Sequence, residues 1–449
     1  MDVVRLEPII ETRISRFPFE NSLKEFPWKA RYASLKEAHR EELYAIMLGD
    51  EPVGAMFVKL GSTPELVFFE VMRHYRGKGI GQAALDILFE RLKEMRCVNL
   101  IVQTGRPEIY TKMGYEFKKI DQGHIKVDIY EPRLEALVNA EARSVFIYSE
   151  RYLIHDFPNH PENGSRVGNT INRIHKENLL NGANFVAPRL ATEEEICLVH
   201  TKEMMENVRR CAEEGRNVAK DTPTGPDSYN LARLSLGGAL MAGDLVEKGR
   251  HIFVFCRPPG HHAGSDRSSG FCFFNNMAAL AVSLHKKGYS PMIIDWDVHH
   301  GNGTQEILYE MPIMYVSLHQ RYLYPNTGSE DETGEGKGKG YTRNIPLGIG
   351  VRDDQYLEVF RETYDIAREM KPDILLISAG QDGHHLDPLS GMRLSSGAYY
   401  EMGRMVGEIA AEHCEGRLIL LLEGGYHLEA NAEALTLAIK GIQTSASDN

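Results

Sequence analysis

The chain has 449 residues, 42% hydrophobic and 25% charged, a composition that excludes a disordered or fibrous protein and predicts two or three domains. No apolar run approaches the roughly 18 residues of a membrane span, and the N-terminus shows no secretory signal, so we expect a cytoplasmic protein without a membrane partner. Six cysteines occur singly, which fits a reducing compartment.

The net charge of −12 is unevenly distributed. Up to residue 140 the chain has 21 basic and 21 acidic residues, so the whole excess of negative charge lies beyond that point. An acidic second half argues against nucleic acid and suits a cationic substrate, while a solvated acidic surface is the commoner explanation.

The first region predicts a small α+β domain over residues 1–130. Alternating apolar and polar residues at 42–48, 52–60 and 65–72 predict a meander of half-buried strands, and 81–95 predicts an amphipathic helix. Residues 131–144 are rich in helix formers and predict a short helical connector. From 145 to 449, short continuous apolar runs alternate with helical stretches, the pattern of an α/β domain whose parallel sheet is buried on both faces.

Five of these apolar runs are each followed by a loop that contains His, Asp or Tyr. The runs are "HIFVF", "PMII", "IMYVSL", "ILLIS" and "LILLL", and the loops begin with "CRPPGHHAG", "DWDVHHGNG", "HQRYLYPNTG", "AGQDGHHLD" and "EGGYH". In open parallel sheets ligands bind beyond the carboxyl ends of the strands, so we expect these five loops to form one site.

The second of these loops carries candidate metal ligands. Asp295, Asp297 and His299 alternate in sequence and would point the same way on a strand. Two carboxylates and one imidazole suit a catalytic zinc, and Asp382, which follows another strand, is the candidate third ligand beside Asp297 and His299. Taken alone, this stretch fits an N-cap or an ion-paired loop as well as it fits a metal site.

Catalytic groups are expected in two further loops. His261 and His262 follow a Pro-Pro-Gly turn and could transfer a proton from water to a leaving amine, with Asp295 and Asn302 as partners for their second ring nitrogens. Tyr426 follows two glycines and could donate a hydrogen bond to a developing oxyanion. In isolation, a histidine pair is more often a surface feature, and such a tyrosine a packed loop residue.

From about residue 145 to 440 the chain resembles the zinc-dependent deacetylases that include class II histone deacetylases and acetylpolyamine amidohydrolases. The matching motifs, in the family's order, are "HPENGSRV", "RPPGHHAG", "GFCFFNN", "DWDVHHGNGT", "SLHQRYLYP", "SAGQDGHHLDPL" and "EGGY". The resemblance implies an arginase-like fold, with an eight-stranded parallel sheet and helices on both faces.

The resemblance also assigns roles to individual residues. It implies zinc ligation by Asp297, His299 and Asp382, proton transfer by His262 beside an electrostatic partner His261, and oxyanion donation by Tyr426. It implies orientation of His261 by Asp295 and of His262 by Asn302, an asparagine typical of the class II-like branch. It further implies a potassium ion bound mostly through backbone oxygens of Asp295, Asp297, His299, Ser317 and Leu318.

Substrate contacts are implied less directly. Gly270, Phe271 and Tyr324 resemble the tunnel wall that holds the aliphatic stem of an acylated amine, whose methylenes are worth roughly 0.8 kcal/mol each when buried. Polyamine-selective members tend to place an acidic residue where this chain has Leu389 in "DPLSG". This favours acetyl-lysine or another mono-acylated amine, with an acetylpolyamine as the alternative substrate.

The first domain resembles the acetyl-CoA-dependent GNAT N-acetyltransferases over roughly residues 45–120. The matching stretches are "VMRHYRGKGIG" and "IYTKMGYEF". The resemblance implies that Tyr110 protonates the departing thiolate and that the pyrophosphate arm is held by Val71, Arg76, Gly77, Gly79 and Gly81. Gln103 and Arg106 depart from the family's usual residues, and no acceptor site is recognisable before residue 43.

The leading prediction is therefore a two-domain enzyme that hydrolyses N-acetyl groups of an acetylated lysine peptide or small acylated amine, with acetyl transfer as a second activity. The rival of another class is a non-catalytic acetyl-CoA sensor or regulatory scaffold. The sequence leaves the oligomeric state open.

Overall fold

The chain divides into two compact units, residues 1–136 and 137–449, and the division falls within the predicted connector. The computed structural model describes part of the first unit and most of the second; the described residues are 4–8, 41–48, 51–59, 64–71, 99–104, 117–121, 123–128, single positions between 81 and 110, 143–177, 179 and 184–445. Residues 131–142 of the predicted helical connector lie outside these residues, and its last two positions are not helical, because β8 begins at Ser144. No helix among them is long and apolar enough to cross a bilayer.

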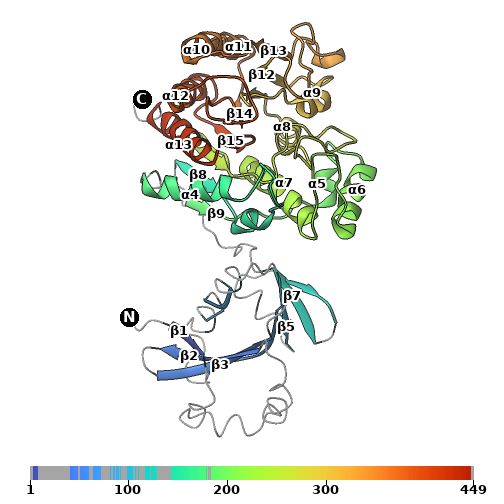
Figure 1. Ribbon diagram of the computed structural model, residues 1–449, viewed down its shortest axis with the longest axis vertical. Helices are drawn as coiled ribbons and strands as arrows, with labels where there is room; N and C mark the ends of the chain where they lie inside the picture. Colours follow the sequence, from blue (N-terminus) through green and yellow to red (C-terminus); the bar gives the residue numbers. More distant parts are fainter. Residues whose placement is uncertain are drawn as a thin grey trace. The chain divides into compact units, whose positions relative to one another are not determined.

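The first unit contains a seven-stranded sheet in the order β1-β2-β3-β4-β5-β7-β6 (Figure 1). Its strands are β1 (Val4–Pro8), β2 (Glu41–Leu48), β3 (Glu51–Lys59), β4 (Glu65–Val71), β5 (Asn99–Gln103), β6 (Phe117–Lys119) and β7 (His124–Asp128). The three predicted strands correspond to β2, β3 and β4, and the described positions between 81 and 92 are helical, as expected. Leu85 and Leu88 of this helix pack with Tyr44 and Val102 in one apolar core.

One pairing in this sheet is parallel and unusually short. Strand β4 pairs with β5 only at Glu65–Ile101 and Leu66–Val102, although β4 continues to Val71. The other pairings in the sheet are antiparallel. Among the described residues, the β4–β5 ladder therefore ends at Leu66 and Val102.

The second unit is built on a sheet whose strands all run parallel, in the order β13-β12-β11-β14-β15-β10-β8-β9. The strands are β8 (Ser144–Ile147), β9 (Asn184–Val186), β10 (His251–Val254), β11 (Pro291–Asp295), β12 (Met314–Gln320), β13 (Thr342–Leu347), β14 (Ile374–Ala379) and β15 (Leu418–Leu422). Seven strands of four to seven residues form the body of the sheet, and the predicted total of eight is reached only with the three-residue β9 at one edge.

Helices cover both faces of this sheet, as the sequence predicts (Figure 1). They are α4 (Ser165–Lys176), α5 (Glu193–Ile196), α6 (Lys202–Glu214), α7 (Ser228–Leu245), α8 (Asn276–Lys286), α9 (Asn302–Leu308), α10 (Asp353–Phe360), α11 (Glu362–Met370), α12 (Ser396–His413) and α13 (Leu428–Ser445). Two short 3-10 turns span Glu150–Ile154 and Gly336–Gly338.

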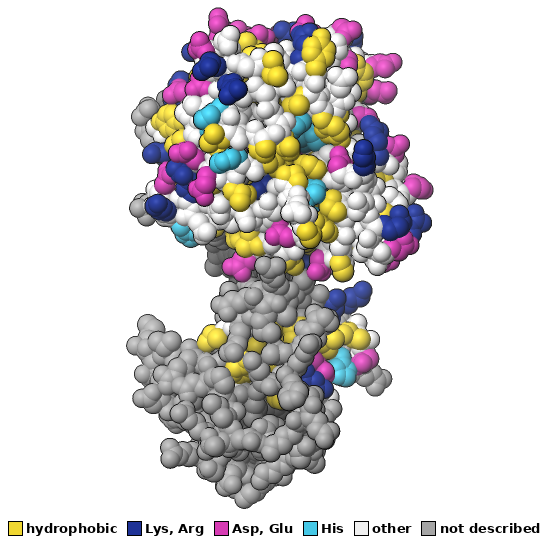
Figure 2. Space-filling view, viewed as in Figure 1, with side chains coloured by type: hydrophobic (Ala, Val, Ile, Leu, Met, Phe, Trp, Pro, Cys, Tyr) yellow, Lys and Arg dark blue, Asp and Glu magenta, His cyan; other side chains and the backbone are white. Residues whose placement is uncertain are grey.

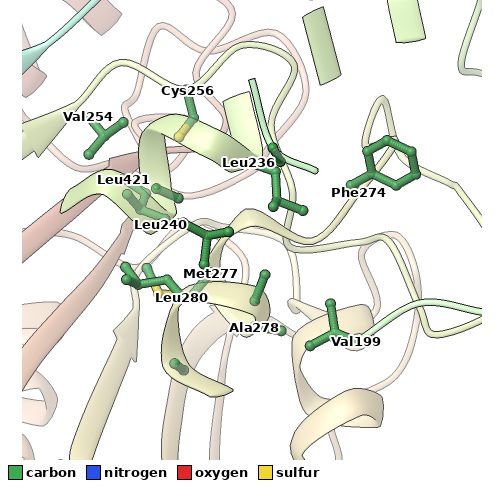
Figure 3. Packing of buried hydrophobic residues seen from close by; sticks show 14 of the residues in the cluster. Val199, Leu236, Leu240, Val254, Cys256, Phe274, Met277, Ala278, Leu280 and Leu421 are labelled. Carbon is green, nitrogen blue, oxygen red and sulfur yellow. The ribbon is translucent and has the colours of Figure 1, made fainter. Parts of the chain in front are cut away.

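Successive strand residues enter opposite cores. In β11, Ile293 joins the core beneath α7 and α8, whereas Met292 and Ile294 join the core beneath α12 and α13. Figure 3 shows the first core, where Leu240 and Leu280 of the helices pack near Leu421 of β15. Burial on both faces explains the continuous apolar runs, and the parallel ladders bring the loops after β10, β11, β12, β14 and β15 to one edge.

Candidate active site

Two carboxylates and one imidazole converge at this edge. Asp297 and His299 lie in the loop after β11, and Asp382 lies in the loop after β14. Their ligand atoms all lie within 4.8 Å of one another. Both carboxylates are fully buried, and His299 is 8% exposed. Two buried carboxylates this close repel each other unless a cation lies between them, so the group has the character of a metal site.

The prediction that Asp295, Asp297 and His299 point the same way along a strand is wrong. Strand β11 ends at Asp295, so the alternation of a strand does not extend to Asp297 and His299. Asp295 instead faces His261 and Tyr315: its Oδ2 lies 3.2 Å from His261 Nδ1 and accepts a hydrogen bond from the Tyr315 hydroxyl at 3.0 Å. The loop after β11, and not the strand itself, therefore positions Asp297 and His299.

Backbone amides and two glycines hold the carboxylates in place. Gly424 N–H donates to Asp297 Oδ2 at 2.7 Å, and Val298 N–H donates to Asp382 Oδ1 at 2.9 Å. A Cβ at Gly424 would lie 2.2 Å from Asp382 Oδ2, and one at Gly380 would lie 2.1 Å from Asp297 Oδ2. Only glycine allows β14 and β15 to end so close to the carboxylates.

The two adjacent histidines lie beside this group with different partners. Their ring centroids are 4.0 Å apart, and His262 Nδ1 lies 2.8 Å from Asn302 Oδ1. Because an amide oxygen accepts, Nδ1 of His262 carries a proton and Nε2 is free to accept one. His261 Nε2 lies 3.8 Å from Asp297 Oδ1, while His261 Nδ1 contacts Asp295.

The same surroundings separate the two pKa values. Burial acts to lower the pKa of His261, but the charges of Asp297 and Asp295 outweigh it and raise that pKa to about 10. Burial lowers the pKa of His262 well below its usual value, and the neighbouring rings of His261 and His299 lower it further. His262 is therefore the neutral member of the pair, as a general base must be.

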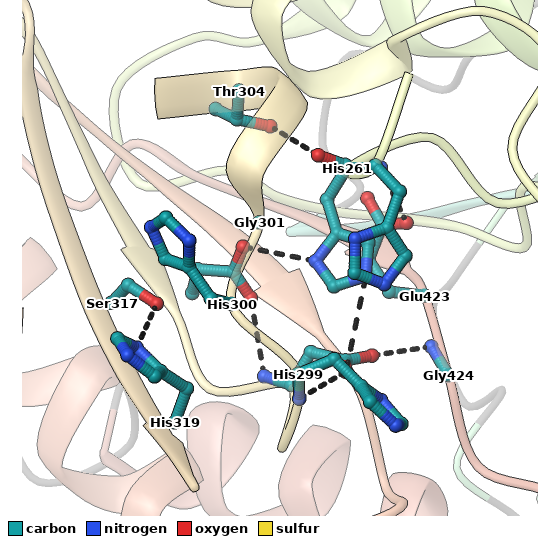
Figure 4. Close-up of polar contacts among 12 residues, drawn as sticks. His261, His299, His300, Gly301, Thr304, Ser317, His319, Glu423 and Gly424 are labelled. Carbon is teal, nitrogen blue, oxygen red and sulfur yellow. Dashed lines mark hydrogen bonds and ion pairs between the residues drawn. The ribbon is translucent and has the colours of Figure 1, made fainter. Parts of the chain in front are cut away.

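Glu423 holds the loop of His261 and His262 in place and was not predicted from the sequence. Glu423, at the end of β15, is fully buried, and its Oε2 accepts the backbone N–H groups of Gly260 at 2.8 Å and His261 at 3.2 Å (Figure 4). Its position within the quoted "EGGY" motif is the only signal that marked it.

Arg166 supports the loop after β15 and was also missed. Its guanidinium donates to the carbonyl oxygens of Glu423 and Gly425, the latter at 2.6 Å, and pairs with Glu162 at 3.0 Å. It also lies 4.9 Å from the centroid of the Tyr426 ring. A buried arginine therefore fixes the turn on which Tyr426 stands.

Tyr426 stands between two anchors. Its backbone N–H donates to Asp387 Oδ2 at 2.6 Å, and its ring meets that of Phe271 edge-on, with centroids 5.6 Å apart. Burial raises the pKa of the phenol well above 10, and the nearby charges of Asp382 and Asp297 add to this increase. The phenol therefore keeps its proton and can act as a donor beside the metal group.

The predicted substrate wall is assembled in part around His262. Gly270 (φ +56°) and Phe271 (φ +67°) adopt left-handed conformations, and a Cβ at Gly270 would lie 2.3 Å from the His262 ring. The Tyr324 ring lies 5.0 Å from that of His262, edge-on. Leu389 is half-buried on the Asp382 loop, where its N–H donates to Asp387 Oδ1 at 2.9 Å.

A further carboxylate near this wall, Asp221, was not predicted. Its Oδ1 accepts from the Thr222 hydroxyl at 2.9 Å, and Thr222 Oγ1 in turn accepts from Phe271 N–H at 3.2 Å. Burial raises the pKa of Tyr324, and the charge of Asp221 contributes to this increase. No motif recognised in the sequence included Asp221.

His300, adjacent to the ligand His299, is occupied elsewhere. Its ring nitrogens lie 2.7 Å from Thr327 Oγ1 and 2.9 Å from Gln305 Oε1, so neither is free for a metal. Of the residues predicted to hold potassium, Asp295 and Ser317 pair in the β11–β12 ladder and Leu318 follows in β12. Asp297 and His299 lie in the loop after β11.

In the first unit, part of the predicted cofactor site is described. Tyr110 is 5% exposed within the core, and burial raises its pKa to about 12. Val71 ends β4 and is partly buried against that core, and Gly81 is the first described residue of the helix. Arg76, Gly77 and Gly79 lie outside the described residues.

Comparison with known families assigns both units. The family described as "Histone deacetylase domain" matches residues 160–442, more than half of the chain. The chain belongs to the histone deacetylase family. The "Acetyltransferase (GNAT) family" matches residues 8–115, which identifies the N-terminal domain as GNAT-like. Both families agree with the resemblances found in the sequence.

Relatives of this histone deacetylase family member cover most of the second unit. A "Probable deacetylase" of Archaeoglobus fulgidus is 38% identical over 65% of this chain and 84% of its own length. The acetoin utilization protein AcuC of Bacillus subtilis is 37% identical over 64% of this chain and 78% of its own.

A third relative and a solved structure point the same way. The "Histone deacetylase-like amidohydrolase" of Pseudomonas aeruginosa is 38% identical over 53% of this chain and 64% of its own length. The crystal structure of the HDA15 HD domain is 31% identical, with a TM-score of 0.63 over 68% of this chain and 93% of that one. The chain is therefore an enzyme of the hydrolase class, with deacetylase or amidohydrolase activity.

Proposed function

We propose that the second unit hydrolyses N-acetyl groups from acetyl-lysine or a related mono-acylated amine with the help of zinc, giving acetate and a free amine. One observation carries this proposal: the Asp297–His299–Asp382 group lies beside a buried, neutral histidine whose Nδ1 is held by Asn302. A metal group next to a poised base is the arrangement that metal-assisted hydrolysis requires.

The donor set fits zinc. Asp297, His299 and Asp382 supply two carboxylates and one imidazole, a three-ligand set that leaves a position open for water or substrate. When bound, zinc supplies a Lewis acid that polarises the acetamide carbonyl and makes water a better nucleophile.

The chain's own residues supply the remaining steps. His262 accepts a proton at Nε2 as water attacks the carbonyl carbon, and returns it to the amine nitrogen as the C–N bond breaks. The Tyr426 phenol, kept protonated by burial, donates to the oxygen on which negative charge develops. His261, between Asp295 and Asp297, presents a positive charge next to the reacting group.

Leu389 supports the mono-acylated substrate over an acetylpolyamine. It brings no charge to the loop after Asp382, whereas a second ammonium of a polyamine would need a carboxylate partner. We also propose that potassium binds beneath the zinc site, where Asp295 and Ser317 pair across neighbouring strands. The unpaired cysteines support a cytoplasmic location.

For the first unit we propose binding of acetyl-CoA, with acetyl transfer as its activity. The β4–β5 ladder, which among the described residues ends at Leu66 and Val102, supports this proposal, because an extended ligand can pair with a strand where its ladder ends. The buried Tyr110 phenol retains its proton, as a donor to a thiolate must. A sensor that binds acetyl-CoA without transfer is the alternative.

The test is acetate release from acetyl-lysine peptides, acetyl-putrescine and acetyl-spermidine by the full chain, before and after chelation, and as Tyr426→Phe. We expect acetyl-lysine to be hydrolysed, chelation to abolish hydrolysis, and Tyr426→Phe to lower kcat by about 10²–10³-fold. Hydrolysis that survives both changes would refute the mechanism. Activity confined to the polyamines would refute the interpretation of Leu389. One bound zinc per chain without acetate release from any substrate would favour the alternative, a non-catalytic acetyl-CoA sensor or regulatory scaffold.

A further inference from the structure

Two buried arginines of the second unit share one buried carboxylate. Glu162 Oε1 accepts a hydrogen bond from Arg257 Nε at 2.7 Å and another from Arg166 Nη1 at 3.0 Å. Both arginine side chains are fully buried, and the side chain of Glu162 is 3% exposed. A single carboxylate oxygen therefore joins two guanidinium groups that are shielded from water.

Arg257 ties the loop of His261 and His262, here called the histidine loop, to the segment between β8 and α4. It lies in the loop after β10, four positions before His261. Besides Glu162, its guanidinium reaches three acceptors in that segment, namely the carbonyl oxygens of Tyr152 and His155 and the Oδ1 of Asp156 at 3.1 Å. The start of the histidine loop is therefore fixed through this one side chain.

Arg166 has the same role for the loop after β15 that carries Tyr426, here called the tyrosine loop. From helix α4 it donates to the carbonyl oxygens of Glu423 and Gly425, the latter at 2.6 Å. Gly425 directly precedes Tyr426, so the peptide group that enters the catalytic tyrosine is held by a guanidinium that Glu162 holds in turn.

The two guanidiniums need the charge of Glu162 in order to lie side by side. Burial would raise the pKa of Glu162, but the charges of Arg257 and Arg166 outweigh it and lower that pKa to about 2, so the carboxylate is ionised at neutral pH. Asp156, the other carboxylate in contact with Arg257, is 40% exposed, and solvent screens it.

Surface ion pairs differ from this group. Figure 2 shows basic and acidic side chains intermixed on the face of the second unit in view, where water and salt weaken each pair. The buried group has no such screening, so removal of its negative charge would leave two positive charges that repel each other. The loops attached to the two arginines would then shift relative to each other.

We propose that Glu162 is a positioning residue, which sets the spacing between the base His262 and the oxyanion donor Tyr426. It acts through Arg257 on the histidine loop and through Arg166 on the tyrosine loop. The inference rests on the proposed deacetylase function and deepens it, because base and donor must meet the same acetamide. A displacement of about 1 Å in such a pair can lower the rate by on the order of 10²-fold.

The test measures acetate release from an acetyl-lysine peptide by the zinc-loaded full chain with Glu162→Gln or Glu162→Ala. Gln keeps an accepting oxygen without the charge, and Ala removes both. Glu195→Ala is the matched control, because it breaks a two-point pair with Arg189, at 2.7 and 2.8 Å, in helix α5. Metal analysis and circular dichroism give the zinc content and the folded fraction.

We expect kcat to fall about tenfold in Glu162→Gln and about 100-fold in Glu162→Ala, with KM within about twofold of the wild type and zinc retained. Glu195→Ala should keep kcat within about twofold. If Glu162→Ala does not fold, Glu162→Gln carries the test. A wild-type kcat in Glu162→Gln overturns the inference.

A double-mutant cycle separates positioning from a general loss of structure. Glu162→Gln is repeated in the Tyr426→Phe and His262→Ala backgrounds. The tenfold loss should shrink to about threefold in each, because only one of the two displaced groups is still present. The same factor in all three backgrounds overturns the inference, since a smaller folded fraction would lower every rate equally.

Crystal structures of the wild type and Glu162→Gln give a readout that does not depend on activity. The distance between His262 Nε2 and the Tyr426 hydroxyl oxygen should differ by about 0.5 Å or more between the two proteins. An unchanged distance overturns the inference and leaves hydrolysis untouched. Absence of acetate release by the wild type from every acetylated amine refutes the proposed function itself.

Discussion

The edges of the two sheets differ in how they prepare a site. In the second unit, side chains from five loops are held by backbone N–H groups, glycine contacts and buried partners, as Asp297 is by Gly424 and His262 by Asn302. In the first unit, the described part of the proposed cofactor site lies where the β4–β5 ladder ends at Leu66. The edge in the second unit therefore holds fixed side chains, whereas for the first unit we propose an extended ligand that pairs with β4.

The difference implies that side-chain substitutions at the second unit's edge should affect chemistry strongly. The first unit's edge should respond mainly to its ligand. Kinetic, stability and binding measurements on variants of the two units separate these effects.

The largest effect is expected from His262→Ala. It removes the neutral base that Asn302 orients, so kcat should fall by about 10²–10⁴-fold while zinc content stays at the wild-type value. Steady-state kinetics and metal analysis check this. His385→Ala, at an exposed histidine of a neighbouring loop, is the control and should stay within about twofold. A similar loss in both variants would contradict the assignment.

The buried carboxylate of Glu162 should make the stability of the second unit depend on pH in the acid range. Burial would raise its pKa, but Arg257 and Arg166 outweigh burial and lower the pKa to about 2 from 4.5. Because the folded-state pKa is lowered, this stabilisation is present above about pH 4.5 and is lost as pH falls toward 2.

The free energy of unfolding of the second unit should therefore fall by about 3 kcal/mol more in the wild type than in Glu162→Gln between pH 4.5 and 2. Denaturant unfolding at several pH values measures the difference. Parallel pH curves for the two proteins would show that the buried pair with the arginines does not hold the carboxylate ionised.

Glu423→Ala tests the support of the histidine loop. Removing the acceptor of Gly260 and His261 N–H should let the loop shift and lower kcat by about 10–100-fold, with zinc still bound. Glu423→Gln keeps an accepting oxygen and should recover most of the rate. If Glu423→Gln is as slow as Glu423→Ala, the negative charge of Glu423 is required and an accepting oxygen is not enough. If both variants retain full activity, the histidine loop does not depend on Glu423.

The smallest effect concerns the first unit. Acetyl-CoA at ten times its Kd should stabilise this unit by about 1.4 kcal/mol, seen as a rise in its melting temperature. The rise should be the same in wild type and His262→Ala and should persist after zinc chelation. Loss of the rise in either sample would contradict the separation of the two sites.

Much of the second unit follows from the sequence because burial on both faces leaves a clear signal. The five continuous apolar runs correspond to β10, β11, β12, β14 and β15, and their loops meet as expected. Strands β8 and β9 are only four and three residues long, and β13 contains Arg343 and Pro346. The edge strands β13 and β9 are too polar and too short, respectively, to stand out, and β8 lies next to β9.

Within the site, residue types that bind metal or move protons could be predicted, and their supports could not. Glu423 contacts Gly260, 163 positions away, and Arg166 reaches Gly425 across 259 positions. Such roles depend on which loops the sheet order brings together, which no local pattern reveals. The prediction that Asp295, Asp297 and His299 share one face of a strand failed for a similar reason, because it required β11 to continue past Asp295.

The most direct test of the account is a zinc titration of the chelated full chain with acetate release from an acetyl-lysine peptide as the readout. Activity should rise from the background rate and level off at one zinc per chain, and Asp382→Asn should lower both the zinc affinity and the plateau. Activity that is unchanged by chelation, or a titration of Asp382→Asn that matches the wild type, would contradict it.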